Sequence, residues 1–421
     1  MAATVYLAFE GADEAPARVI AADLERNGWS VIGGDVHARD NVAALVQTIS
    51  EAGVFVLVAS AAAEQSALMQ RATAAALNNG RAVIVAAAGP LEHDAWIANT
   101  LDPAGFVDMQ ASAEAEALAR IAELARAAAG RGSVIAMLNI KGGVGKTVLA
   151  ANLFAAAHLA DKRAISFIDL DPQHNLTQYF LSPGERGRIR DRNHTLYGVL
   201  NARGENAIPR QDLGGIVIPL NRAKRGKHPR FELVAGDERL FEFTLDTRSE
   251  KDKAEAFQRF RALVAALRAR SDAVIIDSNP CATFLTKLAI TSADHIVAPV
   301  RPEKYSLTGL NMLEQVVREV RGRPLRPEEF SVLLNGVNDR TRSSETGNAD
   351  ALTRAEIQNA PFFGTALIAD EVPYSAVLRS APSDRFAANP INVTAMMRVG
   401  GRPAKEALTR AAAAILRRAA P

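Results

Sequence analysis

Nine residues near position 140, with the sequence NIKGGVGKT at 139–147, combine glycines with two lysines and a threonine. They follow an apolar segment and precede a helical pattern, which is the setting of a phosphate-binding loop. Glycines let the backbone wrap an anion, so that several N–H groups and a helix N-terminus face it. The nucleotide-binding residues that we predict here are Lys141, Gly142, Gly143, Val144, Gly145, Lys146 and Thr147.

The loop's side chains and three carboxylates could supply the chemistry. Lys146 would neutralise the β- and γ-phosphates of a nucleotide, and Thr147 would ligate Mg²⁺. Asp277 ends the apolar segment AVIID and can hold Mg²⁺ through water, although a carboxylate there could instead cap a turn. Asp169 and Asp171 lie in the segment DLDPQHN, where an Asp-Pro turn alone would be weak evidence of function.

The elements that must position these residues alternate between strands and helices. Strands are predicted at residues 133–140, 164–169, 273–277, 295–300 and 331–335, with helices at about 146–160 and 408–419. Continuous apolar strands between helices indicate a parallel sheet covered on both faces. Residues 182–230 are richer in charge, Gly and Pro, which predicts surface loops and a hairpin.

The first 130 residues show the same alternation. Strands are predicted at 4–9, 30–32, 54–59 and 82–87, and helices at 15–27, 42–51, 64–77 and 113–129. The last helix ends in Gly-Arg-Gly at 130–132, where we place a domain boundary. The fold class is therefore α/β, with a flavodoxin-like parallel-sheet domain at 1–130 and a phosphate-loop domain at 131–421.

Composition excludes several classes of protein. The 421 residues are 48% hydrophobic and 23% charged, which is ordinary for a folded chain of two or three domains. Because Cys281 is the single cysteine, an internal disulfide framework is excluded. We expect Cys281 to be a small packed side chain rather than a nucleophile. No segment has the roughly 18 to 20 uninterrupted apolar residues of a membrane span, and Glu10 interrupts any signal peptide. We expect a cytoplasmic protein.

Charge is distributed unevenly between the two halves. Residues 1–131 contain 8 Arg, no Lys and 16 Asp plus Glu, for a net charge of −8. The remainder holds 41 basic and 31 acidic residues, for a net charge of +10. Two such different domains are expected to have different partners.

Residues 133 to about 419 resemble the ParA/MinD family of dimerising ATPases, whose phosphate loop carries the same second lysine. The resemblance lies, in order, in KGGVGKT, DLDPQHN, AVIIDSNP, APVRP and VPYSAVLRSAP. It implies ATP and Mg²⁺ as cofactors. It also implies that Asp171 positions the attacking water and that Asp169 supports the Mg²⁺ shell with Thr147 and Asp277. Lys141 would reach across a dimer interface to the other subunit's nucleotide.

The resemblance therefore names Lys141, Lys146 and Asp171 as the catalytic residues of a homodimer that forms on ATP binding. Asn335 ends the segment SVLLN and could hydrogen-bond the adenine, as a related asparagine does in such ATPases, or it could simply begin a turn. Pro373 belongs to the late segment that resembles the family's loop beside the adenine.

Many members of this family bind DNA without sequence preference through basic residues, because phosphate neutralisation is independent of sequence. The candidates are Arg222, Lys224, Arg225, Lys227 and Arg230 in one loop, and Arg398, Arg402, Lys405, Arg410, Arg417 and Arg418 near the end. A charge run of this kind can also be a solvated face. Arginines of the family's late loop are replaced here by Tyr374 and Val377.

Residues 4 to about 110 resemble a Toll and interleukin receptor (TIR) domain, in VYLAFE at 5–10, GWSV at 28–31 and SEAGVFVLVAS at 50–60. Our alignment places Ala72 where catalytic members carry the glutamate that cleaves NAD, so we expect a noncatalytic interaction domain. Glu64 is a nearby carboxylate that could turn into a pocket. A receiver-like domain, with Asp35 as its candidate acid, is the competing interpretation.

Together these features predict an ATP-dependent dimerising switch for partition or intracellular positioning of DNA or a protein complex. We also expect an activating partner protein and an association with the nucleoid. Two alternatives stay open. One is a positioning ATPase for a pilus or secretion apparatus. The other is a TIR-type signalling or NAD-cleaving protein that its ATPase regulates.

Overall fold

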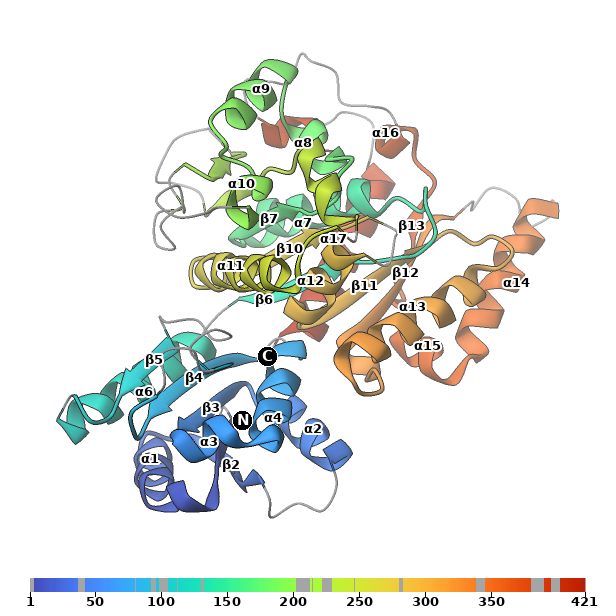
Figure 1. The fold of residues 1–421 in the computed structure, drawn as a ribbon. Helices are drawn as coiled ribbons and strands as arrows, with labels where there is room; N and C mark the ends of the chain where they lie inside the picture. The colour runs from blue at the N-terminus through green and yellow to red at the C-terminus, as the bar shows by residue number, and fades with distance from the viewer. Residues whose placement is uncertain are drawn as a thin grey trace. The chain divides into compact units, whose positions relative to one another are not determined.

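The computed structural model describes residues 4–36, 42–79, 81–91, 96–97, 105–111, 113–129, 132–201, 213, 215–221, 229–245, 247–279, 283–337, 345–379, 390–394 and 402–420. These residues form two compact units, one mainly from residues 1–131 and the other mainly from 132–420 (Figure 1). Each unit contains a sheet with helices on its faces, so the expected α/β class is confirmed.

The sheet of the first unit has the strand order β2-β1-β3-β4-β5, and all neighbouring strands are parallel. Its strands are β1 (Thr4–Phe9), β2 (Ser30–Asp35), β3 (Val54–Ala59), β4 (Ala82–Ala87) and β5 (Phe106–Asp108). The central strand β3 is buried along its whole length because VFVLVA is apolar on both faces. This order is that of the expected flavodoxin-like sheet.

Helices pack on the two faces of this sheet. They are α1 (Glu14–Arg26), α2 (Val42–Glu51), α3 (Ala61–Gln65), α4 (Ala67–Asn78) and α6 (Glu114–Ala129), with a short 3₁₀ turn η1 (Gly11–Asp13) after β1. One apolar cluster includes Ile20 and Ile121, and the other includes Ile49 and Met69. The helix expected at 64–77 is wrong in one respect: Ser66 caps α4 through the Met69 N–H and divides it from α3.

Within the described part of the chain, the second sheet has eight strands in the order β13-β12-β11-β6-β10-β7-β9-β8. They are β6 (Ser133–Met137), β7 (Ile165–Asp169), β8 (Val217–Pro219), β9 (Phe231–Val234), β10 (Ala273–Asp277), β11 (His295–Val300), β12 (Phe330–Val337) and β13 (Val372–Pro373). Among the described strands, only β8 and β9 pair antiparallel; β8 lies in the stretch 182–230, where a hairpin is expected, and β9 begins directly after it. Strands β6, β7 and β10 are fully buried, so the carboxyl ends of three adjacent strands meet at one protected edge.

The helices of this unit are α7 (Lys146–Asp161), α8 (Asn175–Phe180), α9 (Pro183–Asp191), α10 (Leu196–Leu200), α11 (Glu250–Arg268), α12 (Phe284–Ser292), α13 (Ser306–Arg321), α14 (Glu345–Asn359), α15 (Pro361–Ala366), α16 (Ala376–Arg379) and α17 (Arg402–Ala419). Short 3₁₀ turns are η5 (Glu238–Phe243), η6 (Pro327–Glu329) and η8 (Pro390–Val393). Helix α7 is buried along most of its length, and α17 packs against it through Leu408 and Ile415.

Two expectations for this unit need correction. The terminal helix begins at Arg402, six residues before the expected start at 408. Residues 182–230 contain the helices α9 and α10 as well as loops. Helix α9 forms despite its two glycines because Ser182 and Glu185 make a capping box and Pro183 occupies the first turn.

Candidate nucleotide-binding site

The phosphate loop, residues 139–147, connects the carboxyl end of β6 to the first turn of α7. Its backbone needs glycine at two points, because Gly143 has φ +74° and Gly145 has φ +94°. A Cβ on Gly145 would also lie only 2.5 Å from the Asn335 side-chain nitrogen. The expected loop between a buried strand and a helix is therefore present, with its N–H groups ahead of the α7 N-terminus.

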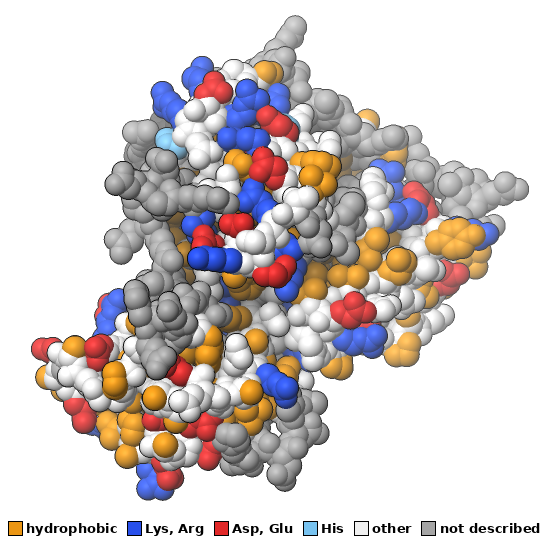
Figure 2. All heavy atoms as spheres, in the orientation of Figure 1, with side chains coloured by type: hydrophobic (Ala, Val, Ile, Leu, Met, Phe, Trp, Pro, Cys, Tyr) orange, Lys and Arg blue, Asp and Glu red, His pale blue; other side chains and the backbone are white. Residues whose placement is uncertain are grey.

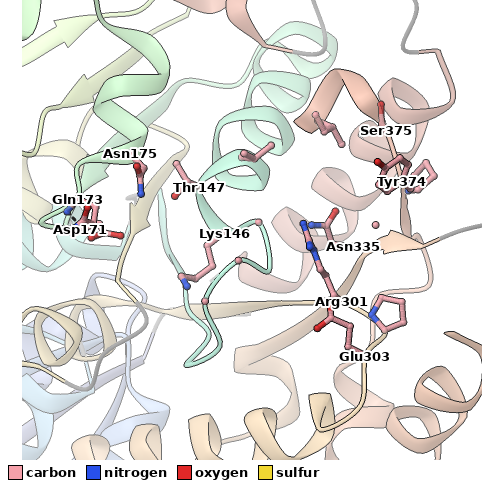
Figure 3. Close-up of a pocket in the computed structure, with 18 residues that line it drawn as sticks. Lys146, Thr147, Asp171, Gln173, Asn175, Arg301, Glu303, Asn335, Tyr374 and Ser375 are labelled. Carbon is pink, nitrogen blue, oxygen red and sulfur yellow. Dashed lines mark hydrogen bonds between the residues drawn. The ribbon is translucent and has the colours of Figure 1, made fainter. Parts of the chain in front are cut away.

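A cavity of about 690 Å³ opens over this loop. Its walls come from five segments: the phosphate loop with the start of α7, the switch segment (residues 169–175), the turn after β11, the end of β12, and the residues around β13 (Figure 3). The lining residues are Gly142, Gly143, Gly145, Lys146, Thr147, Val148, Asp171, Gln173, Asn175, Arg301, Pro302, Glu303, Asn335, Gly336, Pro373, Tyr374, Ser375 and Leu378. This volume suits a small-molecule ligand of nucleotide size.

Lys146 and Thr147 line the cavity between the switch segment and the wall that holds Asn335 (Figure 3). Only 8% of Lys146 is exposed, and its ammonium donates to the carbonyl oxygen of Asn139 at 3.2 Å. Asn139 is itself held by a hydrogen bond from its amide nitrogen to the carbonyl oxygen of Pro299, at 2.6 Å. The lysine is thus kept folded over the loop that it would serve.

Asp277 is completely buried at the end of β10. Neither of its carboxylate oxygens has a hydrogen-bond partner of ordinary geometry among the described residues. Burial, and after it the charge of Asp169, raise the pKa of Asp277 well above the usual range, while Thr147 and Lys146 act in the opposite direction. A buried carboxylate without a partner is costly unless a cation compensates it.

Asp169, at the end of β7, pairs in register with Asp277 on the neighbouring strand β10. One of its oxygens accepts hydrogen bonds from the Thr177 N–H at 2.7 Å and the Thr177 hydroxyl at 2.6 Å. Burial raises the pKa of Asp169 to about 7 in spite of these bonds. Asp169 therefore holds α8 in place, and its predicted support of the Mg²⁺ shell stays a prediction.

Asp171 lines the cavity opposite Asn335 (Figure 3). Its carboxylate accepts a hydrogen bond from the Gln173 N–H at 2.9 Å. Burial raises its pKa, and the Gln173 bond and the Lys146 charge oppose that rise. The structure thus brings Asp171 to the same cavity as Lys146 and Thr147.

Lys141 lies at the start of the loop and does not line the cavity. Its ammonium pairs with Glu303 at 2.5 Å, and the two side chains are 39% and 48% exposed. Val144 is the buried residue of the loop's middle, and its carbonyl oxygen accepts a hydrogen bond from the Asn335 amide at 2.8 Å. Asn335 therefore fastens the phosphate loop, while its contact with adenine stays a prediction, as does that of Pro373.

Sequence reasoning missed several lining residues: Gln173, Asn175, Arg301, Glu303, Gly336, Tyr374 and Ser375. Most lie inside or directly beside the segments DLDPQHN, APVRP and VPYSAVLRSAP. Treating each segment as a whole wall of the pocket, rather than selecting its charged residues, would have found them.

The predicted basic surfaces are only partly described. Arg222, Lys224, Arg225, Lys227 and Arg398 lie outside the described residues, as does Cys281. Arg410 pairs with Asp370 at 2.8 Å, and Arg418 donates to the carbonyl oxygens of residues 365–367. These two arginines stabilise the segment that precedes β13. None of the described helices is long and apolar enough to cross a membrane.

Comparisons with known proteins agree with this geometry. A family described as an AAA domain matches residues 132–328, and a TIR domain matches residues 5–122. The chromosome-partitioning ATPase Soj of Thermus thermophilus is 30% identical over 251 residues, covering 59% of this chain and 84% of Soj. The chromosome partitioning protein ParA of Caulobacter vibrioides is 30% identical over 254 residues, with the same coverage.

A solved structure shares the fold. The putative plasmid partition protein of Borrelia burgdorferi, bound to AMPPNP, aligns with a TM-score of 0.50 and 18% identity, covering 68% of this chain and 99% of that one. The TIR match also decides between the two interpretations of the first unit, which strand order alone does not separate. The chain belongs to the ParA/Soj family of partition ATPases, and a TIR domain precedes its ATPase unit.

Proposed function

We propose that the chain is a Mg²⁺-dependent ATPase switch that dimerises on ATP binding and partitions or positions a cargo. The buried Asp277 carboxylate beside the phosphate loop carries this proposal. Neither of its oxygens has a hydrogen-bond partner of ordinary geometry among the described residues, which fits a magnesium ion held partly through water. Mg²⁺ needs few protein ligands when phosphates supply the others, and Thr147 with Asp277 would be sufficient. The ion would neutralise charge that develops during phosphoryl transfer.

The chain's own residues would then divide the work. The N–H groups of residues 142–147 and the Lys146 ammonium bind and orient the phosphates. Asp171 accepts a hydrogen bond from a water and orients it, which its place on the cavity wall allows. Closure of the cavity by a second subunit would exclude bulk water from these groups.

The position of Lys141 supports the proposal that the chain forms a dimer. It is half-exposed and held by an exposed glutamate, so it can exchange Glu303 for another anion at modest cost. In a dimer that anion would be the phosphate group in the partner's cavity. ATP binding and dimerisation would thus be linked through one side chain.

The relatives named above are partition proteins, and we propose the same role here. The net charge of +10 on residues 132–421 supports duplex DNA as the surface that the ATP-bound dimer binds. An activating partner protein would stimulate hydrolysis and so release the dimer.

The test uses the full chain carrying Asp171→Ala, with ATP and Mg²⁺, on an immobilised duplex of arbitrary sequence. We expect retention at low salt that falls about 10-fold or more on raising salt from 50 to 200 mM, because each neutralised phosphate releases counterions. Equal retention of the Lys146→Ala protein, which should not bind ATP, would show charge-driven adsorption and contradict the switch. No retention of either protein would remove DNA as the bound surface.

A further inference from the structure

A second cavity, of about 300 Å³, lies between α8, α9 and the turn that connects β9 to η5. Thr177 and Gly236 form part of its wall. Four charged residues line it: Arg186, Arg190, Asp237 and Glu238. It is lined by none of the phosphate-loop residues. The cavity therefore belongs to the ATPase unit but not to the nucleotide-binding site.

Most charges of this cavity are already compensated. Arg190 pairs with Glu238 at 2.8 Å. Asp237 is paired with Arg239 at 2.8 Å and also accepts a hydrogen bond from the Thr195 hydroxyl. Arg186 differs: its Nε is buried and has no hydrogen-bond partner among the described residues. A buried donor of this kind is costly until an acceptor reaches it.

The wall of the cavity is bonded directly to the switch segment. The Gly236 N–H donates to the Thr177 hydroxyl oxygen at 2.9 Å, and that hydroxyl donates to Asp169 at 2.6 Å. Gly236 also packs so closely on Asp169 that a Cβ there would lie 2.7 Å from its carbonyl oxygen. Asp169 in turn accepts a long bond from the Asp171 N–H, at 3.4 Å. A ligand that moves this wall would therefore move the residues that hold Asp171.

We propose that this cavity binds a carboxylate side chain from an acidic segment of a partner protein, with the Arg186 guanidinium as its anchor. A guanidinium fork matches a carboxylate in two parallel hydrogen bonds. This proposal rests on the proposed function, because it gives the activating partner a place beside the switch segment.

The surroundings favour a single carboxylate over a nucleic acid backbone. Arg188, Arg190 and Arg192 are exposed, but the acidic residues Asp191 and Glu238 are interspersed among them. Figure 2 shows this mixture of blue and red side chains over the region of α9. A continuous row of phosphates would run past Asp191 and Glu238 together. A single carboxylate at Arg186 would meet only the lining acids Asp237 and Glu238, whose charges Arg239 and Arg190 already neutralise.

The experiment measures phenylglyoxal modification of each arginine by mass spectrometry on the full-length protein. The probes are two peptides, GSESG and its neutral counterpart GSQSG, at millimolar concentration. We expect GSESG to slow modification of Arg186 about threefold or more, and GSQSG to leave it unchanged. Arg188 is the internal control, because it lies on the same helix and does not line the cavity.

Equal protection by both peptides, or equal protection of Arg188, would overturn the proposal, since either would indicate nonspecific contact. Selective protection of Arg186 by a 20-base-pair duplex and not by GSESG would overturn it in favour of nucleic acid. ATP hydrolysis by the same preparation is measured separately. Its absence would contradict the proposed function alone, whereas hydrolysis without protection of Arg186 would contradict only this inference.

Discussion

The two units of this chain carry polar residues at the carboxyl edges of their parallel strands, but the loops that follow their first strands differ in charge. In the ATPase unit the strand β6 leads into glycines with positive φ and a buried lysine. In the TIR unit the strand β1 leads into Glu10 and the turn η1, which ends at the buried Asp13. Both parallel sheets place the loop after their first strand at the carboxyl edge, and the residues of that loop determine whether a ligand of negative charge is favoured there.

The buried acids of the two units sharpen this difference. Asp13 accepts a hydrogen bond from the Ser60 hydroxyl at 2.6 Å, which opposes the rise in pKa that burial causes. Asp277 has no such partner of ordinary geometry among the described residues, and burial raises its pKa well above the usual range. Asp13 is thus stabilised by a hydrogen bond within its own unit, whereas Asp277 lacks a partner of ordinary geometry and is suited to a metal ion.

The largest effect is expected from Lys146→Ala, which removes the cation at the centre of the ATPase edge. We expect ATP affinity to fall about 100-fold or more, because a charge-assisted contact with phosphate is lost. Isothermal titration calorimetry with the exposed Lys287→Ala as control would measure it, with melting curves to confirm folding. Unchanged affinity would show that this edge does not bind phosphate.

Next in size is the separation of hydrolysis from dimerisation. Asp171→Ala should bind ATP, hydrolyse it about 10- to 100-fold more slowly and accumulate as a dimer, because a water-orienting group is lost. Lys141→Ala should bind ATP but stay monomeric. Light scattering with ATP distinguishes the two proteins, and a monomeric Asp171→Ala protein would contradict the dimer mechanism.

A smaller effect is expected from Glu303→Gln, which releases Lys141 from its intramolecular partner. Half-exposed ion pairs contribute at most about 1 kcal/mol, so the ATP concentration for half-maximal dimerisation should fall about two- to fivefold. Glu328→Gln, an exposed change of the same charge outside the cavity lining, is the control. Weaker dimerisation would mean that Glu303 positions Lys141 for the dimer.

The contrast between the two edges was partly accessible from sequence. The phosphate loop, the place of Asp171 near it and the parallel strands could be predicted because their residue types and order are local and specific, while the role of Asp171 stays a prediction. The hydrogen bonds of Asp169 with Thr177 could not, since the backbone turn between them decides where each side chain lies. The role of Asn335 in fastening Val144 likewise depends on two segments 191 residues apart.

Helix α9 shows a further limit. Gly184 and Gly187 suggested a loop, but the capping box of Ser182 with Glu185 stabilises the first turn. The division between α3 and α4 has the same cause, because serines favour helix caps over helix interiors. At both places the observed helix boundaries differ from the expected ones because of capping residues, which apolar periodicity does not reveal.

The smallest effect is expected when the full-length protein is incubated with NAD, because we expect no release of nicotinamide. Ala72 is completely buried in the apolar cluster beneath α4, so this position offers no carboxylate to stabilise an oxocarbenium cation. Glu64, on the neighbouring helix α3, is the alternative acid. Nicotinamide release should stay at the level of a protein-free sample, in both the wild type and Glu64→Gln, whether or not ATP is present. Nicotinamide release by the wild type that Glu64→Gln abolishes would show that the TIR unit is catalytic. The chain would then hold two active sites, one at the carboxyl edge of each sheet.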